Sequence, residues 1–200
     1  MLPALALSGP PKPYQGLNYD NVVTVRNQDV ALTTIKTPQG KQFLATNTAS
    51  TPVISVPDTQ TFTLHSAFVA INVLTDNSLL IPAQTGTVLF TGTRPDGSTV
   101  EEKVEYTPTG KDVVIENGIV IAGTAYLQEV KFEKLSGITT LVVTVQEGSS
   151  AIDIGGTAVC NTLLALGIDL NSAFNGLNLD GFKYDVVEWY GKPPADGQKW

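Results

Sequence analysis

The sequence predicts an all-β protein, folded as an antiparallel two-sheet β-sandwich of the jelly-roll kind. Many short segments alternate apolar and polar residues, which is the pattern of half-buried strands. These segments follow one another at roughly regular spacing with turn residues between them. The composition agrees, because 18 glycines, 12 prolines and only 16% charged residues favour strands and turns over long helices.

The strands can be placed along the chain by these signals. The run 61–74 begins with strict alternation and then becomes apolar on both faces, as in a central strand that is covered on both sides. Asp96-Gly97 and Asn117-Gly118 are hairpin signals, and 109–112 predicts a further turn. The expected strands are 21–26, 30–36, 42–46, 53–56, 61–74, 88–93, 100–106, 113–115, 119–121, 126–132, 139–146 and 180–188.

The 200 residues suit one domain that can bury a core of its own. Residues 1–15 predict an extended, proline-rich N-terminal arm, 16–190 the β-sandwich domain, and 191–200 a C-terminal tail. Inside the domain, leucines and alanine near 160–170 predict one short helix or ordered insertion.

Charge limits the partners that we expect. The net charge is −7 and the pI is near 4.6, with no cluster of Lys and Arg. This argues against nucleic acid and against anionic membrane surfaces. The apolar runs also fall short of a membrane span. An acidic surface is compatible with neutral polysaccharides, basic partners or Ca²⁺, although solubility alone would also explain it.

The chain has one cysteine and one histidine, which nearly excludes metal sites built on imidazole ligands and leaves one conceivable catalytic triad. Cys160 allows no internal disulfide and no thiolate zinc site. His65 is expected to be a solvated strand residue, because the Gly-x-Ser-x-Gly motif of a serine hydrolase does not occur. No catalytic residue is therefore predicted.

A short segment near the start recurs near the end. Gly16-Leu17-Asn18-Tyr19-Asp20 and Gly176-Leu177-Asn178-Leu179-Asp180 differ at one position. If the first and last strands pair, Asp20 and Asp180 would meet and could hold a structural Ca²⁺, with Asn18, Asn178 or Asp153 as further oxygen ligands. The alternative is that both aspartates cap turns.

Aromatic residues gather at the two ends of the sandwich domain. Tyr14, Tyr19, Trp189 and Tyr190 would approach one another if the ends are adjacent. Flat rings with polar tips can cover the C–H groups of sugars, so these four predict a ligand-binding platform for a glycan. The alternative is that such rings fill the core; Trp189 and Tyr190, as neighbours in a strand, would face opposite ways.

Three stretches carry a resemblance to a known group. Residues 13–19 resemble a proline-preceded Y-x-G-L-x-Y/W opening, 62–68 an F-x-L-x-S-x-Y/F central strand, and 179–184 a closing L-D-N/D-F-x-Y. Together they resemble small secreted fungal proteins with a carbohydrate-binding-module-like β-sandwich. The resemblance implies the jelly-roll fold, a secreted protein and a structural Ca²⁺ between terminal strands. Gly181 departs from the closing motif, and Cys160 lacks the partner that secreted relatives often carry.

These observations predict a secreted, non-catalytic module that binds a polysaccharide or a cell-wall surface. One alternative is an extracellular structural or host-interaction protein without a glycan ligand. Another is a carbohydrate-active lyase or hydrolase that uses carboxylates on the concave sheet, for which Glu101, Glu105 and Glu129 are among the candidates. Whether the protein is an enzyme is left open.

Overall fold

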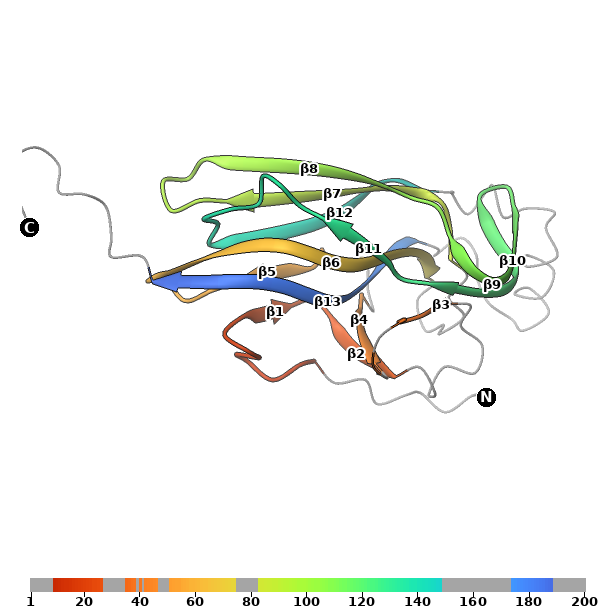
Figure 1. Cartoon of the computed structure of the whole chain (residues 1–200), viewed down its shortest axis with the longest axis horizontal. Helices are drawn as coiled ribbons and strands as arrows, with labels where there is room; N and C mark the ends of the chain where they lie inside the picture. The colour runs from red at the N-terminus through yellow and green to blue at the C-terminus, as the bar shows by residue number, and fades with distance from the viewer. Residues whose placement is uncertain are drawn as a thin grey trace, which may run out of the picture.

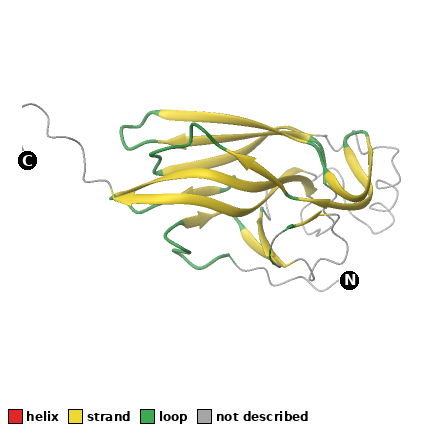
Figure 2. Cartoon of the chain, viewed as in Figure 1, coloured by secondary structure: helices red, strands yellow, loops and turns green. Residues whose placement is uncertain are grey.

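A computed structural model of the chain describes residues 9–26, 35–38, 40, 42–46, 51–74, 83–148 and 174–188. These residues form strands and loops without a helix, as Figure 2 shows. The strands are β1 (Asn18–Asp20), β2 (Val23–Arg26), β3 (Ile35–Lys36), β4 (Gln42–Ala45), β5 (Val53–Ser55), β6 (Gln60–Leu74), β7 (Gly86–Thr93), β8 (Thr99–Tyr106), β9 (Thr109–Glu116), β10 (Ile119–Tyr126), β11 (Gln128–Lys131), β12 (Thr140–Gly148) and β13 (Phe174–Glu188).

Two five-stranded antiparallel sheets form the body of the protein. One has the order β1-β5-β12-β7-β8 and the other the order β11-β6-β13-β4-β2, and the two lie as layers in Figure 1. Alternate residues of each sheet point into the space between them, where Phe62, Leu64 and Phe90 are 1% exposed or less. The predicted all-β, jelly-roll-like sandwich is therefore confirmed.

The long strands β6 and β13 lie side by side at the centre of their sheet. They pair in antiparallel fashion from one end to the other. The expected central strand at 61–74 is confirmed, and its residues 66–73 are buried. The last strand begins at Phe174, well before the expected start at 180, because neighbours on both sides satisfy a segment whose Gly176 and Asn178 have little strand preference of their own.

A third, three-stranded sheet with the order β3-β10-β9 was not expected from the sequence. Asn117-Gly118 makes the predicted hairpin between β9 and β10, and both residues have positive φ. The turn expected at 109–112 is wrong, because these residues begin β9 and the chain leaves β8 at Thr107-Pro108. The strand expected at 126–132 is divided at Leu127, where the chain leaves β10 for β11 in another sheet.

The expected pairing of the first and last strands is also wrong. β1 pairs with β5, whereas β13 belongs to the opposite sheet between β6 and β4. The two strands meet across the sandwich instead, where the rings of Tyr19 and Phe182 lie 5.9 Å apart.

The helix expected at 160–170 lies outside the described residues. In the part of the chain that the structure describes, no helix has the length and apolar character that crossing a membrane requires.

Candidate functional site

A bulge in β13 creates the geometry of the candidate site. β13 pairs with β4 only at Asn178 and Leu179, and its register with β6 shifts directly after Asp180. Gly181 at the shift has a φ of 55°, and a Cβ atom there would lie 2.6 Å from the Phe68 ring. Only glycine fits this close approach. After the bulge β13 no longer pairs with β4, so another segment can pack along that edge of the strand.

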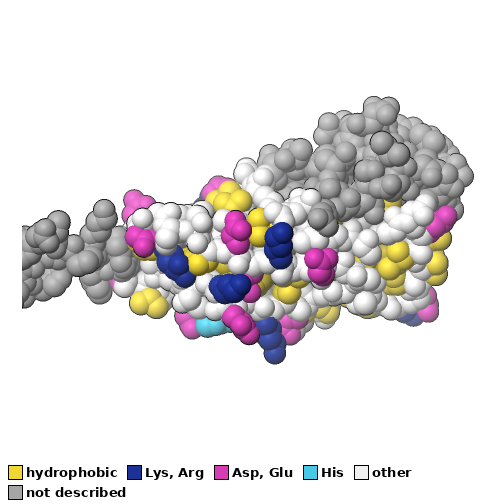
Figure 3. Space-filling view, turned by 90° about the horizontal axis from the view of Figure 1, so that it is seen from above, with side chains coloured by type: hydrophobic (Ala, Val, Ile, Leu, Met, Phe, Trp, Pro, Cys, Tyr) yellow, Lys and Arg dark blue, Asp and Glu magenta, His cyan; other side chains and the backbone are white. Residues whose placement is uncertain are grey.

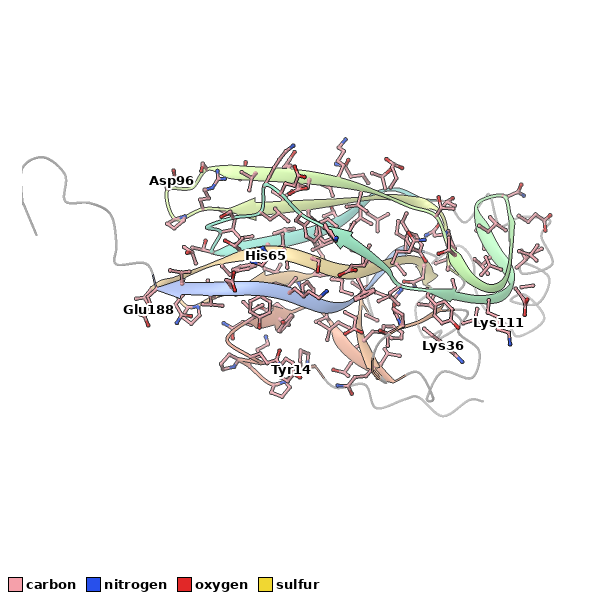
Figure 4. The ribbon with its side chains drawn as sticks, viewed as in Figure 1. Tyr14, Lys36, His65, Asp96, Lys111 and Glu188 are labelled. Carbon is pink, nitrogen blue, oxygen red and sulfur yellow. The ribbon has the colours of Figure 1, made fainter. Side chains whose placement is uncertain are left out.

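The described part of the N-terminal arm, residues 9–15, folds together with Gly16 and Leu17 against this part of β13. Tyr14 and Leu17 exchange backbone hydrogen bonds of 2.8 and 3.1 Å, which closes a tight turn through Gln15 and Gly16, both with positive φ. The Tyr184 hydroxyl donates to the Gln15 carbonyl at 2.7 Å. Figure 4 shows Tyr14 on this segment, beneath β13.

A cavity of about 230 Å³ lies between the arm, the strands β2 and β4, and β13. Thr24 and Gln42 line it from β2 and β4. Aromatic rings dominate the rest of the lining, together with one carboxylate and one amide. Among these residues are Tyr14, Gln15, Tyr19, Asp180, Phe182 and Tyr184.

Two tyrosine hydroxyls of the cavity form a chain of hydrogen bonds. A hydrogen bond joins Tyr19 to Tyr184, whose hydroxyl donates in turn to the carbonyl of Gln15. Burial is the main cause that raises the pKa of Tyr19, and it also raises the pKa of Tyr184. Both phenols are therefore neutral at physiological pH, and their rings hold the arm against β13.

Asp180 is the only charged residue among the described lining residues. Its Oδ2 accepts a hydrogen bond from the Thr37 hydroxyl. Burial raises the pKa of Asp180, while hydrogen bonds from Thr37 and from the Gly181 backbone act in the opposite direction. The site thus holds a half-buried carboxylate whose hydrogen-bond donors are neutral groups.

Three of the six predicted site residues meet at this cavity, namely Tyr14, Tyr19 and Asp180. Asp20 does not line it and instead forms an ion pair with Lys12 of the arm. The other two, Trp189 and Tyr190, lie outside the described residues, and so does Asp153. The proposed ligand Asn178 donates to Asn72 at 2.6 Å in the core, and Asn18 is half-buried on β1.

Sequence reasoning missed Phe182 and Tyr184, which supply rings to the same cavity. The two residues alternate in sequence with the charged residues Lys183 and Asp185, which are exposed. This alternation could have predicted that both rings lie on one face of the last strand. Phe182 is half-buried, and it packs against the core as well as lining the cavity wall.

His65 lies apart from the cavity on the exposed face of β6, as expected. Its Nε2 is 2.8 Å from Asp185 Oδ2, and both side chains are at least half exposed. Figure 4 shows His65 on β6. A second exposed pair, Lys183 with Glu129 at 2.8 Å, bridges β13 and β11. Figure 3 shows basic and acidic side chains interspersed on one face of the molecule.

Comparison with known proteins adds little to this geometry. No family model matches the chain, and no curated protein matches it. Among solved structures, a carbohydrate-binding module, TmCBM61 in complex with beta-1,4-galactotriose, is 10% identical with a TM-score of 0.32, over 86% of each chain. An exo-beta-agarase is 12% identical with a TM-score of 0.35, over 92% of this chain but only 24% of the agarase. Both TM-scores are low, so neither structure defines what the cavity holds.

Proposed function

We propose that the protein is a non-catalytic module that binds a glycan in the cavity between its N-terminal arm and β13. The observation that carries this proposal is the lining itself. Rings from Tyr14, Tyr19 and Phe182 surround a small number of polar groups that point at one space. Small-molecule sites typically combine apolar and aromatic walls with a few convergent polar groups, and this cavity has both.

The lining offers both kinds of contact that a sugar ring needs. The flat faces of the aromatic rings cover the C–H groups of a pyranose, and the carboxylate of Asp180 and the amide of Gln42 can bond its hydroxyls. Tyr14 is the most exposed ring of the lining, because it is 46% exposed, whereas Tyr19 is 5% exposed and Phe182 and Tyr184 are partly buried. A ligand would therefore stack on Tyr14 at the entrance.

The size of the cavity limits the length of ligand that it can enclose. At about 230 Å³ it is smaller than the roughly 300–1,000 Å³ of sites that enclose drug-sized ligands. One sugar unit would fill it, with the rest of the polymer lying outside. The proposed ligand contact is thus a chain end or a branch, rather than a long run of the polymer.

Binding to purified wall polysaccharides, measured by pull-down and calorimetry, tests this function. Tyr14→Ala should weaken binding about tenfold through the loss of ring contact. Tyr126→Ala is the matched control, because Tyr126 is also exposed but lies on β10, away from the cavity. Lack of binding to every polymer, or equal loss in both variants, would refute the proposal. Release of reducing or unsaturated ends would instead identify an enzyme.

Secretion remains part of the proposal. A structural Ca²⁺ at Asp20 and Asp180 is proposed as the alternative to a ligand on Asp180, because both would use the same carboxylate. The described residues contain no group of three or more His, Cys, Asp or Glu side chains arranged to hold a metal. Neutral oxygens and residues such as Asp153 would therefore have to complete the site. A melting temperature that falls when EDTA is added would support the ion, and one that does not change would refute a tightly bound Ca²⁺.

A further inference from the structure

We propose that the sugar held in this cavity carries a free, positively charged amino group, so that the ligand is an amino sugar rather than a neutral one. This inference rests on the proposed glycan-binding function. The observation behind it is that the carboxylate of Asp180 shares one small cavity with the rings of Tyr14, Tyr19 and Tyr184.

A carboxylate in such a setting is costly without a cation. Asp180 accepts from the hydroxyl of Thr37 and from the backbone of Gly181, and both donors are neutral. Lys12 pairs with Asp20 and Lys183 pairs with Glu129, and no ion pair joins Asp180 to any residue that the structure describes. Partial burial removes water from the carboxylate, so a cationic ligand would regain part of the lost solvation energy.

The tyrosine rings favour the same kind of ligand. An ammonium group near the face of an aromatic ring is attracted by the negative charge density of that face. Its three N–H groups can also donate to the carboxylate and to neighbouring oxygens. The chain as a whole carries a net charge of −7, which attracts cations and repels acidic glycans.

A neutral sugar should bind in this cavity with lower affinity than an amino sugar. Its hydroxyls can donate to Asp180, but such hydrogen bonds leave the carboxylate charge without an opposite charge. Hydrogen bonds between two charged partners are stronger than those with one neutral partner. The cavity should therefore discriminate between sugars that differ only in whether the amine is free or acetylated.

The test compares β-1,4-linked glucosamine oligomers with their fully N-acetylated counterparts and with neutral glucose oligomers of the same length. Calorimetry at a pH below the amine pKa gives the three affinities. Wild-type protein should bind the free amine about tenfold more tightly than either other ligand. High salt should reduce that preference, since part of it is a charge interaction near solvent.

Variants then assign the preference to Asp180. Asp180→Asn should bind all three ligands with similar affinity, because its amide carries no charge with which the amine can pair. Asp185→Asn removes a charge from the opposite face of the same strand and should retain the preference. Tyr14→Ala should weaken the binding of all three ligands.

The outcomes separate this inference from the proposed function. Equal binding of amine and acetylated oligomers by the wild type would overturn the amino-sugar inference and leave glycan binding in place. A preference that persists in Asp180→Asn, or disappears in Asp185→Asn, would also overturn it. Failure to bind any oligomer or any wall polymer would overturn the proposed function itself.

Discussion

The pentapeptide Gly-Leu-Asn-x-Asp occurs twice in the chain, and its two copies lie in different structural surroundings. The copy at 16–20 forms a turn and a three-residue strand at the edge of one sheet, whereas the copy at 176–180 lies inside the 15-residue β13 of the other sheet. In both copies the leucine is buried, with Leu17 at 0% and Leu177 at 3% exposure. The local pattern therefore sets which side chain faces the core.

The polar residues of the two copies differ more. Asn18 is half-buried, while Asn178 is fully buried and bonded to Asn72. Asp20 forms a surface ion pair with Lys12, and Asp180 is the half-buried carboxylate of the cavity. The comparison teaches that a repeated sequence determines which side chains face the core, but not what its polar side chains bind. Residues from distant segments decide which partner each polar group has.

The largest effects should come from the two leucines, where the copies are alike. Leu17→Ala and Leu177→Ala should each lower the free energy of unfolding by about 2–5 kcal/mol, because each leaves a cavity in the core. Chemical denaturation measures both values. A loss well below this range for one variant only would show that the two copies do not share the same role in the core.

The asparagines should separate the copies. Asn178→Ala should cost about 1–3 kcal/mol, because it leaves the buried Oδ1 of Asn72 without the amide that donates to it. Asn18→Ala should cost about 0.5 kcal/mol or less, since Asn18 is partly solvated. Denaturation curves for both variants provide the test. Equal losses would contradict the difference in burial.

The fourth residue of the motif is Tyr19 in one copy and Leu179 in the other. Tyr19→Phe keeps the ring but removes the hydroxyl that bonds Tyr184, and should cost about 1 kcal/mol at neutral pH. The pKa of Tyr19 is raised in the folded state, so its contribution is present below the ordinary tyrosine pKa and is lost as pH rises through the raised value. The variant should therefore lose less stability than wild type in alkaline solution. Parallel pH curves would contradict this.

The smallest effect should come from the aspartates, and it should have the opposite sign. Burial raises the pKa of Asp180, so ionisation opposes folding as pH rises through the folded-state pKa. Asp180→Asn should raise the melting temperature by about 2 °C at neutral pH, with the gain disappearing in acid below the ordinary carboxyl pKa. Asp20→Asn should change it little, because exposed ion pairs contribute little. A lower melting temperature for Asp180→Asn would show that its bonds outweigh its burial.

Sequence reasoning located most strands, because alternation and turn residues are local signals. β6, β7 and β8 follow the expected ranges within about two residues, and the turn between β9 and β10 lies at the expected Asn117-Gly118. Sequence reasoning failed where pairing with neighbouring strands overrides the local preference of a segment for a turn or loop. The segment before Asp180 is a strand because β6 and β4 pair with it, and residues 109–112 extend a strand although their composition suits a turn.

Part of the lining of the candidate cavity could be predicted for the same reason. Aromatic residues near both ends and a carboxylate after the second pentapeptide pointed to Tyr14, Tyr19 and Asp180. The pairing of Asp20 with Asp180 was expected from a sheet order that the chain does not adopt. Gly181 was judged a departure from a motif, whereas it is the residue that lets the Phe68 ring approach β13 at the bulge.

By itself, the sequence determined the all-β class, the central strand and the residues that face the core, because side-chain alternation is a property of each strand alone. Only the tertiary structure decided the sheet order, the bulge after Asp180 and the fold of the arm against β13. These depend on which distant segments satisfy one another's hydrogen bonds and apolar surfaces. Because the two copies of the pentapeptide pair with different distant segments, one is an edge strand and the other lies at the wall of a cavity.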